Sequence, residues 1–470
     1  MELRLTTYLL IFLLITGQNL FGQNQASIFY FGTAGIDFRT DPPTALINSR
    51  MNGLESPASI CDSAGNLLFY TNGGNNPGSP GTSENGAIWT RNHEVMENGY
   101  LLDTAGCNSS FQGAIIIPVP GDVNRYYVFT KDCVENIFIA PKENRGLRYT
   151  MVDISLNGGL GKVIEKGVPV VAYDLISSAP ISSDNEPVSG ILHDNNRDYW
   201  IFSYKMDSIY SLLVDSTGIH SYITHDIGNG RIVISPKRDF IVFGKALYRL
   251  NCSNGKIFNK LELNASSVEF SPNGNYLYTI KNQKLMQYDL LANNLLSSEI
   301  LIGNDVSSQL SLAPNGKIYN WDYKSNRLKS VIACPNEPEL NCAYQNTSFD
   351  LNGKSIEREL TNVLPNFLYR DSIVCSEPPT RFLGEKDPEC LINIYPNSGI
   401  DAVNITFSDD SIGACSLVIY NILGQCQEQF YNIQEETVTL QTKTWPSGLY
   451  ILRLFKNNIE HCRKKLIVVK

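Results

Sequence analysis

The chain has 470 residues, 43% of them hydrophobic and 18% charged, with a formal net charge of −9. This composition excludes disorder over the whole chain and allows a large core in more than one domain. An acidic chain without a long run of Lys and Arg argues against a nucleic-acid partner bound through its phosphates. The 24 Tyr, 20 Phe and 35 Gly predict many strands joined by turns, an all-β protein.

The N-terminus has the order of a secretory signal peptide. Arg4 precedes the apolar run "LTTYLLIFLLI" at residues 5–15, and "TGQNLFGQ" follows. We assign residues 1–22 to the signal peptide, with cleavage after Gly22 and Gln23 as the first mature residue. An apolar run of about eleven residues is too short to span a bilayer, and no later stretch is long enough, so no transmembrane segment is expected after signal removal.

Residues 23–370 contain a repeat that predicts a β-propeller. A polar turn followed by an aromatic or aliphatic strand recurs in segments beginning at Asp62, Gly121, Asp194, Ser235, Ser271 and Ala313. The last four of these segments begin 36 to 42 residues apart, close to the length of a four-stranded blade. A blade buries its faces only against neighbouring blades, so we expect a ring of about seven blades. A parallel β-helix would need shorter and more uniform repeats.

A second, smaller β unit follows the propeller-like region. Residues 371–390 combine paired Pro with mixed charge and lack strand alternation, which predicts a linker. Residues 391–470 contain six or seven short strand patterns, typical of a small β-sandwich.

Four motifs in this unit carry a family resemblance: "IYPN" at 394–397, "IYNILGQ" at 419–425, "PSGLYILRL" at 446–454 and "KKLIVVK" at 464–470. Together they resemble the C-terminal sorting domain of proteins exported by the bacterial type IX secretion system. The resemblance implies a β-sandwich recognised by the outer-membrane translocon and a sortase-like peptidase. It also implies export through the periplasm to the outer cell surface, followed by release or attachment to lipopolysaccharide. The one departure is Ser398, where the family usually repeats Pro.

The resemblance places the sorting signal on nine residues of this chain. In the physical interpretation, Gly424 allows a chain reversal, Gly448 permits a close turn before Tyr450, and two lysines lie where the final strand emerges, available to a receptor. The nine residues are Tyr395, Pro396, Asn397, Gly424, Gly448, Tyr450, Lys464, Lys465 and Lys470.

The body of the chain is also similar to secreted propeller-like proteins that carry this sorting domain. The similarity is carried by "FYFGTAGIDF" at 29–38, "HDNNRDYWIF" at 193–202, "SQLSLAPNGKIY" at 308–319 and "VLPNFL" at 363–368. It implies a fold and a location, but no activity.

Eleven cysteines in an exported protein suggest some disulfides, with at least one thiol left free because the count is odd. Cys334 and Cys342 flank a Pro-containing loop, and we predict that they pair.

The sequence offers little catalytic chemistry. It lacks G-x-S-x-G and H-E-x-x-H, and the spacing of His220 and His225 puts them on opposite faces of a strand. His193 beside Asp194 is interpreted as a turn-capping cluster over Trp200. Asp- and Asn-Gly turns supply too few carboxylates for a calcium loop. We therefore predict no cofactor, no metal site and no catalytic residue, and leave enzymatic activity open.

Three functions remain as hypotheses. The first is a binding or adhesion module for a glycan or protein, with Trp89, Trp200 and Trp321 as candidate contacts, although Trp in such repeats is more often core. The second is an extracellular enzyme acting on polysaccharide or peptide. The third is a structural component of the cell surface or the gliding machinery. Two carboxylates, or a His with Tyr or Arg, converging in the central channel with shifted pKa values would favour the enzyme. An apolar or merely wet channel would favour binding.

Overall fold

The computed structural model divides the chain into two compact units, Met1–Cys375 and Ser376–Lys470. We call them the ring unit and the tail unit. The predicted signal peptide, its cleavage site at Gly22 and Gln23, and almost all of the predicted linker lie outside the described residues. The structure describes residues 24–51, 54–75, 86–101, 106–133, 146–170, 186–205, 208–226, 230–306, 308–373, 392–396, 398–399, 401–407, 415–421, 426–431, 433–456 and 459–469.

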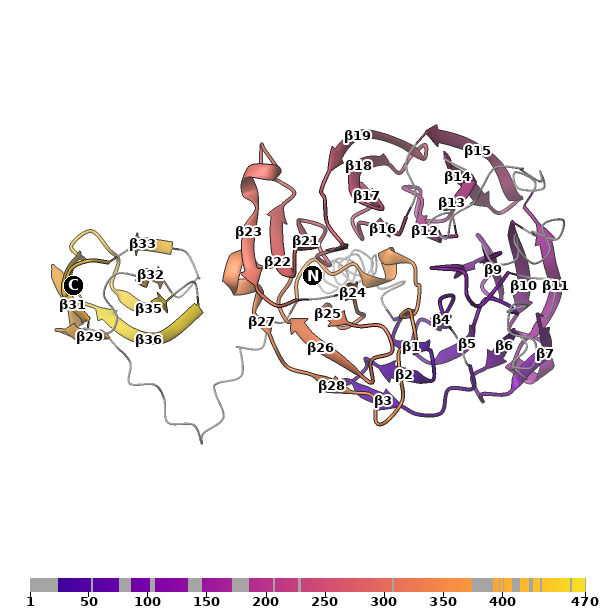
Figure 1. Cartoon of the computed structure of the whole chain (residues 1–470), viewed down its shortest axis with the longest axis horizontal. Helices are drawn as coiled ribbons and strands as arrows, with labels where there is room; N and C mark the ends of the chain where they lie inside the picture. Colours follow the sequence, from indigo (N-terminus) through magenta and orange to yellow (C-terminus); the bar gives the residue numbers. More distant parts are fainter. Residues whose placement is uncertain are drawn as a thin grey trace, which may run out of the picture. The chain divides into compact units, whose positions relative to one another are not determined.

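Strands of the ring unit follow one another in sheets arranged around a centre, and all but one of their pairings are antiparallel in the described residues (Figure 1). The first sheet contains β1 (Ile28–Phe31), β2 (Ala34–Asp37) and β3 (Thr44–Leu46). An eight-stranded sheet contains β4 (Ala58–Cys61), β5 (Leu67–Thr71), β6 (Ala87–Thr90), β7 (Val95–Tyr100), β8 (Ala114–Pro118), β9 (Arg125–Lys131), β10 (Leu147–Asp153) and β11 (Lys162–Pro169).

Three four-stranded sheets and one five-stranded sheet complete the ring. The first four-stranded sheet contains β12 (Val188–Leu192), β13 (Tyr199–Lys205), β14 (Ser208–Asp215) and β15 (Gly218–Asp226), and the second contains β16 (Ile232–Ile234), β17 (Phe240–Phe243), β18 (Ala246–Asn251) and β19 (Lys256–Glu262). The third contains β20 (Ser267–Phe270), β21 (Tyr276–Lys281), β22 (Lys284–Asp289) and β23 (Ile300–Gly303). The five-stranded sheet contains β24 (Gln309–Leu312), β25 (Ile318–Trp321), β26 (Arg327–Ile332), β27 (Tyr344–Gln345) and β28 (Phe349–Asp350). Short 3-10 helices occupy Asn157–Gly159, Leu296–Ser298, Glu339–Cys342 and Pro365–Leu368, the last labelled η8.

The first strands of successive sheets contact one another in the order β1, β4, β8, β12, β16, β20, β24. The last sheet returns to the first, because Lys317 forms an ion pair with Asp41 at 2.9 Å and the rings of Phe38 and Tyr319 lie 6.1 Å apart. These contacts confirm the all-β, propeller-like ring. Its eight-stranded sheet is two four-stranded halves joined by one parallel β7–β11 pairing, so the number of blades stays a prediction.

The six turns that carry the sequence repeat each join the first two strands of a sheet or half-sheet. In the turn after β20, the N–H of Ser271 donates to the carbonyl of Tyr276, and the N–H of Gly274 donates back to Ser271. Equivalent pairs of bonds close the turns at His193, Ser235 and Ala313. The repeated sequence therefore encodes a repeated turn on one face of the ring.

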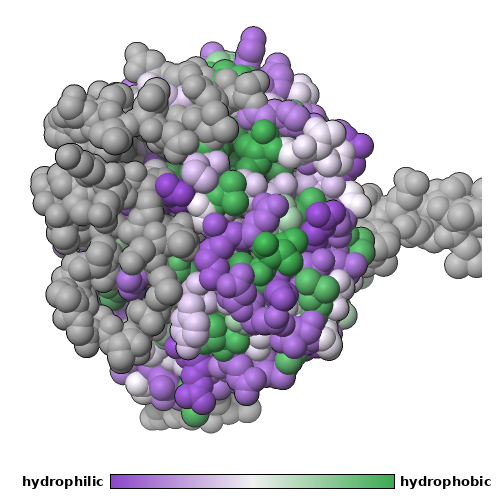
Figure 2. Space-filling model, turned by 90° about the vertical axis from the view of Figure 1, so that its right-hand side faces the viewer, coloured by the Kyte–Doolittle hydropathy of each residue, from purple (hydrophilic) through white to green (hydrophobic). Residues whose placement is uncertain are grey.

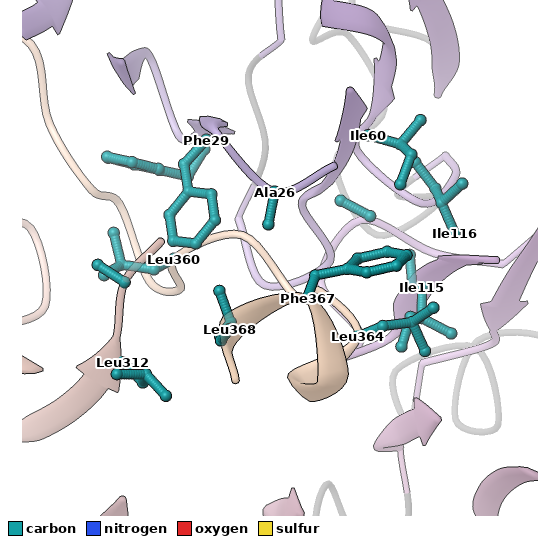
Figure 3. Packing of buried hydrophobic residues seen from close by; sticks show 14 of the residues in the cluster. Ala26, Phe29, Ile60, Ile115, Ile116, Leu312, Leu360, Leu364, Phe367 and Leu368 are labelled. Carbon is teal, nitrogen blue, oxygen red and sulfur yellow. The ribbon is translucent and has the colours of Figure 1, made fainter. Parts of the chain in front are cut away.

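The last part of the ring unit does not form a sheet. Residues 355–370, which we call the closing segment, run through the centre of the ring instead. Leu360, Leu364, Phe367 and Leu368 are buried there and pack against residues of the first strands, such as Ile115 (Figure 3).

Polar bonds tie the closing segment to several sheets. The side-chain amide of Asn362 donates to the carbonyls of Ala114 at 2.8 Å and Val188 at 2.9 Å, which belong to β8 and β12. The hydroxyl of Thr361 donates to the carbonyl of Tyr30 on β1 at 2.6 Å. A closed ring therefore depends on residues at its C-terminal end.

The tail unit is a sandwich of two sheets. One contains β29 (Ile392–Tyr395), β31 (Ala402–Phe407) and β34 (Thr437–Gln441), and the other, in spatial order, contains β30 (Ser398–Gly399), β36 (Ile459–Val468), β35 (Gly448–Lys456), β32 (Cys415–Asn421) and β33 (Cys426–Phe430). Between them lies a separate core that includes Ile405, Leu417, Trp445 and Leu452. The expected small sandwich is confirmed in its all-β character and its two-sheet layout.

Candidate functional site

The centre of the ring holds a cavity of about 70 Å³. Its lining follows the whole of β16, from Arg231 before the strand to Pro236 after it, and includes much of the closing segment. Pockets for drug-sized ligands measure roughly 300–1,000 Å³, so this cavity has room for a few waters or one small chemical group. We call it the central cavity.

At the central cavity an ion pair joins Arg231, the residue before β16, to the closing segment. Nη1 of Arg231 donates to both carboxylate oxygens of Glu359, at 2.8 Å each, and the Glu359 side chain is 4% exposed. The guanidinium carbon of Arg231 also lies 5.8 Å from the centre of the Phe111 ring. Burial raises the pKa of Glu359, and the charge of Arg231 opposes that rise. The pair fixes the closing segment to the middle of the ring.

A second carboxylate, Glu269 of β20, also lines the central cavity. Its oxygens accept backbone N–H bonds from Leu312 at 3.0 Å and Phe270 at 2.9 Å. Burial raises the pKa of Glu269 to about 7, so its carboxyl group is partly protonated near neutral pH. Two carboxyl groups with raised pKa values thus line the same cavity as an arginine, and one of them contacts it. Two such carboxyl groups in the channel were expected from the sequence to favour an enzyme.

Charged and aromatic side chains gather where the closing segment begins. Nη1 of Arg358 donates to Oε1 of Glu55 at 2.7 Å, and its guanidinium carbon lies 5.2 Å from the centre of the Tyr323 ring. Nζ of Lys324 lies 5.4 Å from the same ring. Tyr323 is 51% exposed, and Glu55 also lines the central cavity. We call Tyr323, Lys324, Arg358 and Glu55 the aromatic-cation cluster.

The three tryptophans considered as ligand contacts are core residues. Trp89, Trp200 and Trp321 are 7%, 5% and 1% exposed. The indole N–H of Trp200 donates to the carbonyl of Cys252 at 2.8 Å, and that of Trp321 donates to the hydroxyl of Ser311 at 3.0 Å. Ligand contact through these three side chains is therefore ruled out by their burial.

His193 caps a turn, as expected. Its Nδ1 bonds to the N–H of Asn195 at 3.0 Å, and its ring lies 5.6 Å from the ring of Trp200. His220 and His225 bond to different partners, Asp215 and Ser211. Within the described part of the chain, no group of three or more His, Cys, Asp or Glu side chains is placed to hold a metal ion.

The predicted disulfide between Cys334 and Cys342 is wrong. Cys342 keeps a buried free thiol that hydrogen-bonds to the hydroxyl of Tyr278, whereas Cys334 is disulfide-bonded to a different cysteine. The two residues are nevertheless neighbours, because the N–H of Cys334 donates to the carbonyl of Cys342 at 2.9 Å. Their side chains diverge, since the thiol of Cys342 points to Tyr278. A disulfide that the sequence did not indicate joins Cys107 and Cys133.

The predicted sorting residues have different surroundings in the tail unit. Tyr395 is 79% exposed, and Tyr450 is buried with its hydroxyl donating to the carbonyl of Pro446 at 2.8 Å. Gly448 begins β35 without a positive φ, and an added Cβ would meet no atom within 4 Å. Neither the backbone conformation nor the space at position 448 therefore requires the glycine that a close turn was expected to need.

The two lysines of β36 lie on opposite faces of their sheet. Lys465 is exposed, whereas Lys464 pairs with the buried Leu452 and is half-buried. Pro396 is exposed and follows a cis peptide bond. The remaining three predicted positions, Asn397, Gly424 and Lys470, lie outside the described residues.

The tail unit has a recognisable family. Residues 393–469 match the family described as secretion system C-terminal sorting domain. This sorting domain indicates a secreted or cell-surface protein. No helix in the described part of the chain has the length and apolar character needed to cross a membrane. A comparison with curated proteins found no match.

The solved structures similar to this chain are distant from it. The extracellular domain assigned to a hybrid two-component system of B. thetaiotaomicron is 13% identical with a TM-score of 0.33, covering 89% of this chain and 56% of that one. The calcium-binding protein regucalcin of Agrobacterium tumefaciens is 12% identical with a TM-score of 0.28, covering 64% and 84%. Hydrazine synthase of Kuenenia stuttgartiensis is 10% identical with a TM-score of 0.32, covering 69% and 83%. The chain thus spans little more than half of the first neighbour, and such scores carry no argument about ligand or activity.

Proposed function

We propose that the protein is a secreted or surface-attached binding module, in which the ring recognises a glycan or protein ligand and the sorting domain directs export through the type IX translocon. The observation that supports binding is the size of the central cavity, about 70 Å³, beside the buried apolar residues of the closing segment. Recognition then falls to the surface of the ring.

The aromatic-cation cluster is the part of that surface we propose as a ligand contact. Tyr323 supplies a half-exposed ring, and Arg358 and Lys324 place cations against it. Aromatic rings and arginine are the side chains that contribute most to binding interfaces. On the side of the ring that carries β10 and β11, by comparison, apolar residues are scattered among polar ones (Figure 2).

Glycan-array and surface-protein screening with the mature protein tests the proposal. Tyr323→Ala and Arg358→Ala should weaken binding of the ligand found, by roughly tenfold for a contact residue. Tyr100→Ala is the matched control, because Tyr100 is also 51% exposed but lies at the end of β7. Equal loss in the Tyr323 and Tyr100 variants, or no ligand together with turnover of a polymer, would contradict the proposal.

An extracellular enzyme is the second candidate, favoured by the carboxyl group of Glu269 in the central cavity with its pKa of about 7. Acid–base catalysis works best with a pKa near the working pH. The carboxylate oxygens of Glu269 are occupied by backbone N–H groups, and the cavity is small, which is why we rank this function second. Turnover of a polysaccharide or peptide that disappears in Glu269→Gln with folding intact would reverse the order.

We also propose that the sorting domain is read by the translocon and a sortase-like peptidase after removal of residues 1–22. Deletion of residues 391–470 should leave the protein in the periplasm, with Gln23 at its N-terminus. Normal appearance of the truncated protein outside the cell would contradict this role.

A further inference from the structure

Two residues that line the central cavity, Arg231 and Ser189, keep hydrogen-bond donors without a partner among the described residues. Nη1 of Arg231 makes both bonds to Glu359, and the Nε and Nη2 donors of the same guanidinium make none. The hydroxyl of Ser189, on β12, is also unused, although the residue is only 2% exposed. Buried polar groups are nearly always hydrogen-bonded, so unused donors beside a cavity indicate a bound water or ligand.

Both residues reach the cavity from neighbouring first strands. Ser189 and Ile191 lie on the same side of β12, because side chains alternate along a strand. Ile191 packs in one buried cluster with Ile232 and Ile234 of β16, the strand that the cavity follows. Arg231 comes directly before β16, and β12 contacts β16. The unused donors therefore lie on two adjacent walls of one cavity.

The unused side of the Arg231 guanidinium determines the chemistry of the ligand. Parallel N–H groups of an arginine bind a carboxylate or a phosphate through two hydrogen bonds. The bonds from Nη1 to Glu359 and the Phe111 ring, 5.8 Å from the guanidinium carbon, hold the guanidinium in place. The hydroxyl of Ser189 adds a further donor. An oxyanion is thus the ligand that matches these groups.

The carboxyl groups around the cavity limit the charge of that oxyanion. Glu359 is neutralised by its ion pair with Arg231. Glu55, which also lines the cavity, is paired with Arg358 at 2.7 Å. Glu269 is partly protonated near neutral pH, and its protonated carboxyl group can share a proton with a ligand carboxylate. A singly charged carboxylate therefore meets little repulsion here, whereas a doubly charged phosphate meets more.

We propose that the central cavity is a binding site for one carboxylate group, held by the guanidinium of Arg231 and the hydroxyl of Ser189. A volume of about 70 Å³ admits a carboxylate group and little more. The ligand is a small monocarboxylic acid, or an acidic sugar that inserts its carboxylate. This site goes beyond the proposed function, which places recognition on the aromatic-cation cluster.

Titration of the mature protein with acetate and with glucuronate tests the site, with calorimetry and the melting temperature as readouts. Ser189→Ala should weaken binding by roughly tenfold, the loss expected for one hydrogen bond to a charged group. The variant should fold normally, because this hydroxyl has no partner among the described residues. Ser330→Ala is the matched control, since Ser330 also has a buried hydroxyl without a partner but belongs to β26 and does not line the cavity.

Two further comparisons test the chemistry of the site. Arg231→Lys keeps a positive charge beside Glu359 but removes the parallel donors, so it should lower carboxylate affinity at least tenfold. Acetamide, which is uncharged, and inorganic phosphate should each bind roughly tenfold more weakly than acetate.

Acetate binding that Ser189→Ala weakens and Ser330→Ala leaves unchanged supports the site with a free acid as ligand. The same pattern with glucuronate alone supports the site with an acidic sugar. Absence of binding by both carboxylates at millimolar concentration, equal losses in the two serine variants, or stronger binding of phosphate would overturn the proposal.

Discussion

Replacement of Gly274 by alanine should destabilise the ring unit more than the same change at Gly353, although both glycines have positive φ. Their φ values are +67° and +76°. Alanine in this left-handed region costs about 1 to 2 kcal/mol at either position. A Cβ at Gly353 would meet no atom within 4 Å, so backbone strain is the only penalty there.

At Gly274 the new Cβ would also collide with the neighbouring turn. It would lie 2.5 Å from Cβ of Lys237 and 2.8 Å from Oγ of Ser235. Overpacking of this kind adds roughly 1 to 3 kcal/mol, so we expect a total loss of about 2 to 5 kcal/mol for Gly274→Ala and about 1 to 2 kcal/mol for Gly353→Ala. The physical claim is that neighbouring turns press directly on one another.

Urea unfolding of the mature protein measures both losses. Three of the four tryptophans, Trp89, Trp200 and Trp321, belong to the ring unit, so fluorescence follows mainly its unfolding. Adding Lys237→Gly to Gly274→Ala removes the nearest colliding atom and should recover part of the difference in a double-mutant cycle. Equal losses for the two alanine variants, or no recovery, would refute the contact between turns.

Three further predictions concern the centre of the ring and the cysteines. Arg231→Met should destabilise the ring by about 3 to 5 kcal/mol because it leaves Glu359 buried without its ion-pair partner. In urea unfolding, the double variant Arg231→Met with Glu359→Leu should recover much of this lost stability. A double variant no more stable than Arg231→Met alone would contradict the explanation. Folding raises the pKa of Glu269 from 4.5 to about 7, so the stabilising contribution of its protonated carboxyl group is complete below pH 4.5 and is lost as the pH rises through 7. Glu269→Gln should therefore flatten the fall in the free energy of unfolding between pH 5 and 8. An unchanged slope would argue against the raised pKa. Peptide mapping without reduction should show Cys107 joined to Cys133 and Cys342 as a free thiol; a Cys334–Cys342 peptide would contradict the structure.

The strands and turns of the ring could be predicted because each depends on local chemistry. The Ser271–Gly274 turn requires Asn and Gly at fixed positions, and the flanking strands are aromatic and aliphatic and mostly buried, so the repeat is visible in the sequence alone. The sorting domain was predictable for a similar reason, since its four motifs fall on or beside strands of one compact unit.

The ring centre could not be predicted, because it depends on contacts between distant residues. Arg231 and Glu359 are 128 positions apart, and neither belongs to a motif. One local signal was available: Glu269 sits between Val268 and Phe270 in a strand whose other residues are buried, and an acid in such a strand needs buried partners. The disulfide prediction failed although the two residues are close along the chain, because Cys334 and Cys342 direct their side chains apart.

The order of the chain has a consequence for how the two units form. The closing segment comes last in the ring unit, yet its apolar residues fill the centre. Its polar residues Thr361, Asn362 and Glu359 bond to β1, to β8 and β12, and to Arg231 immediately before β16. The ring therefore cannot complete its core until residues up to 370 are available, and contacts of such long sequence separation make folding slow. The sorting domain has its own core, so we expect it to fold without waiting for the ring. Because the two cores are separate, the translocon can recognise the folded sorting domain whether or not the ring has finished folding.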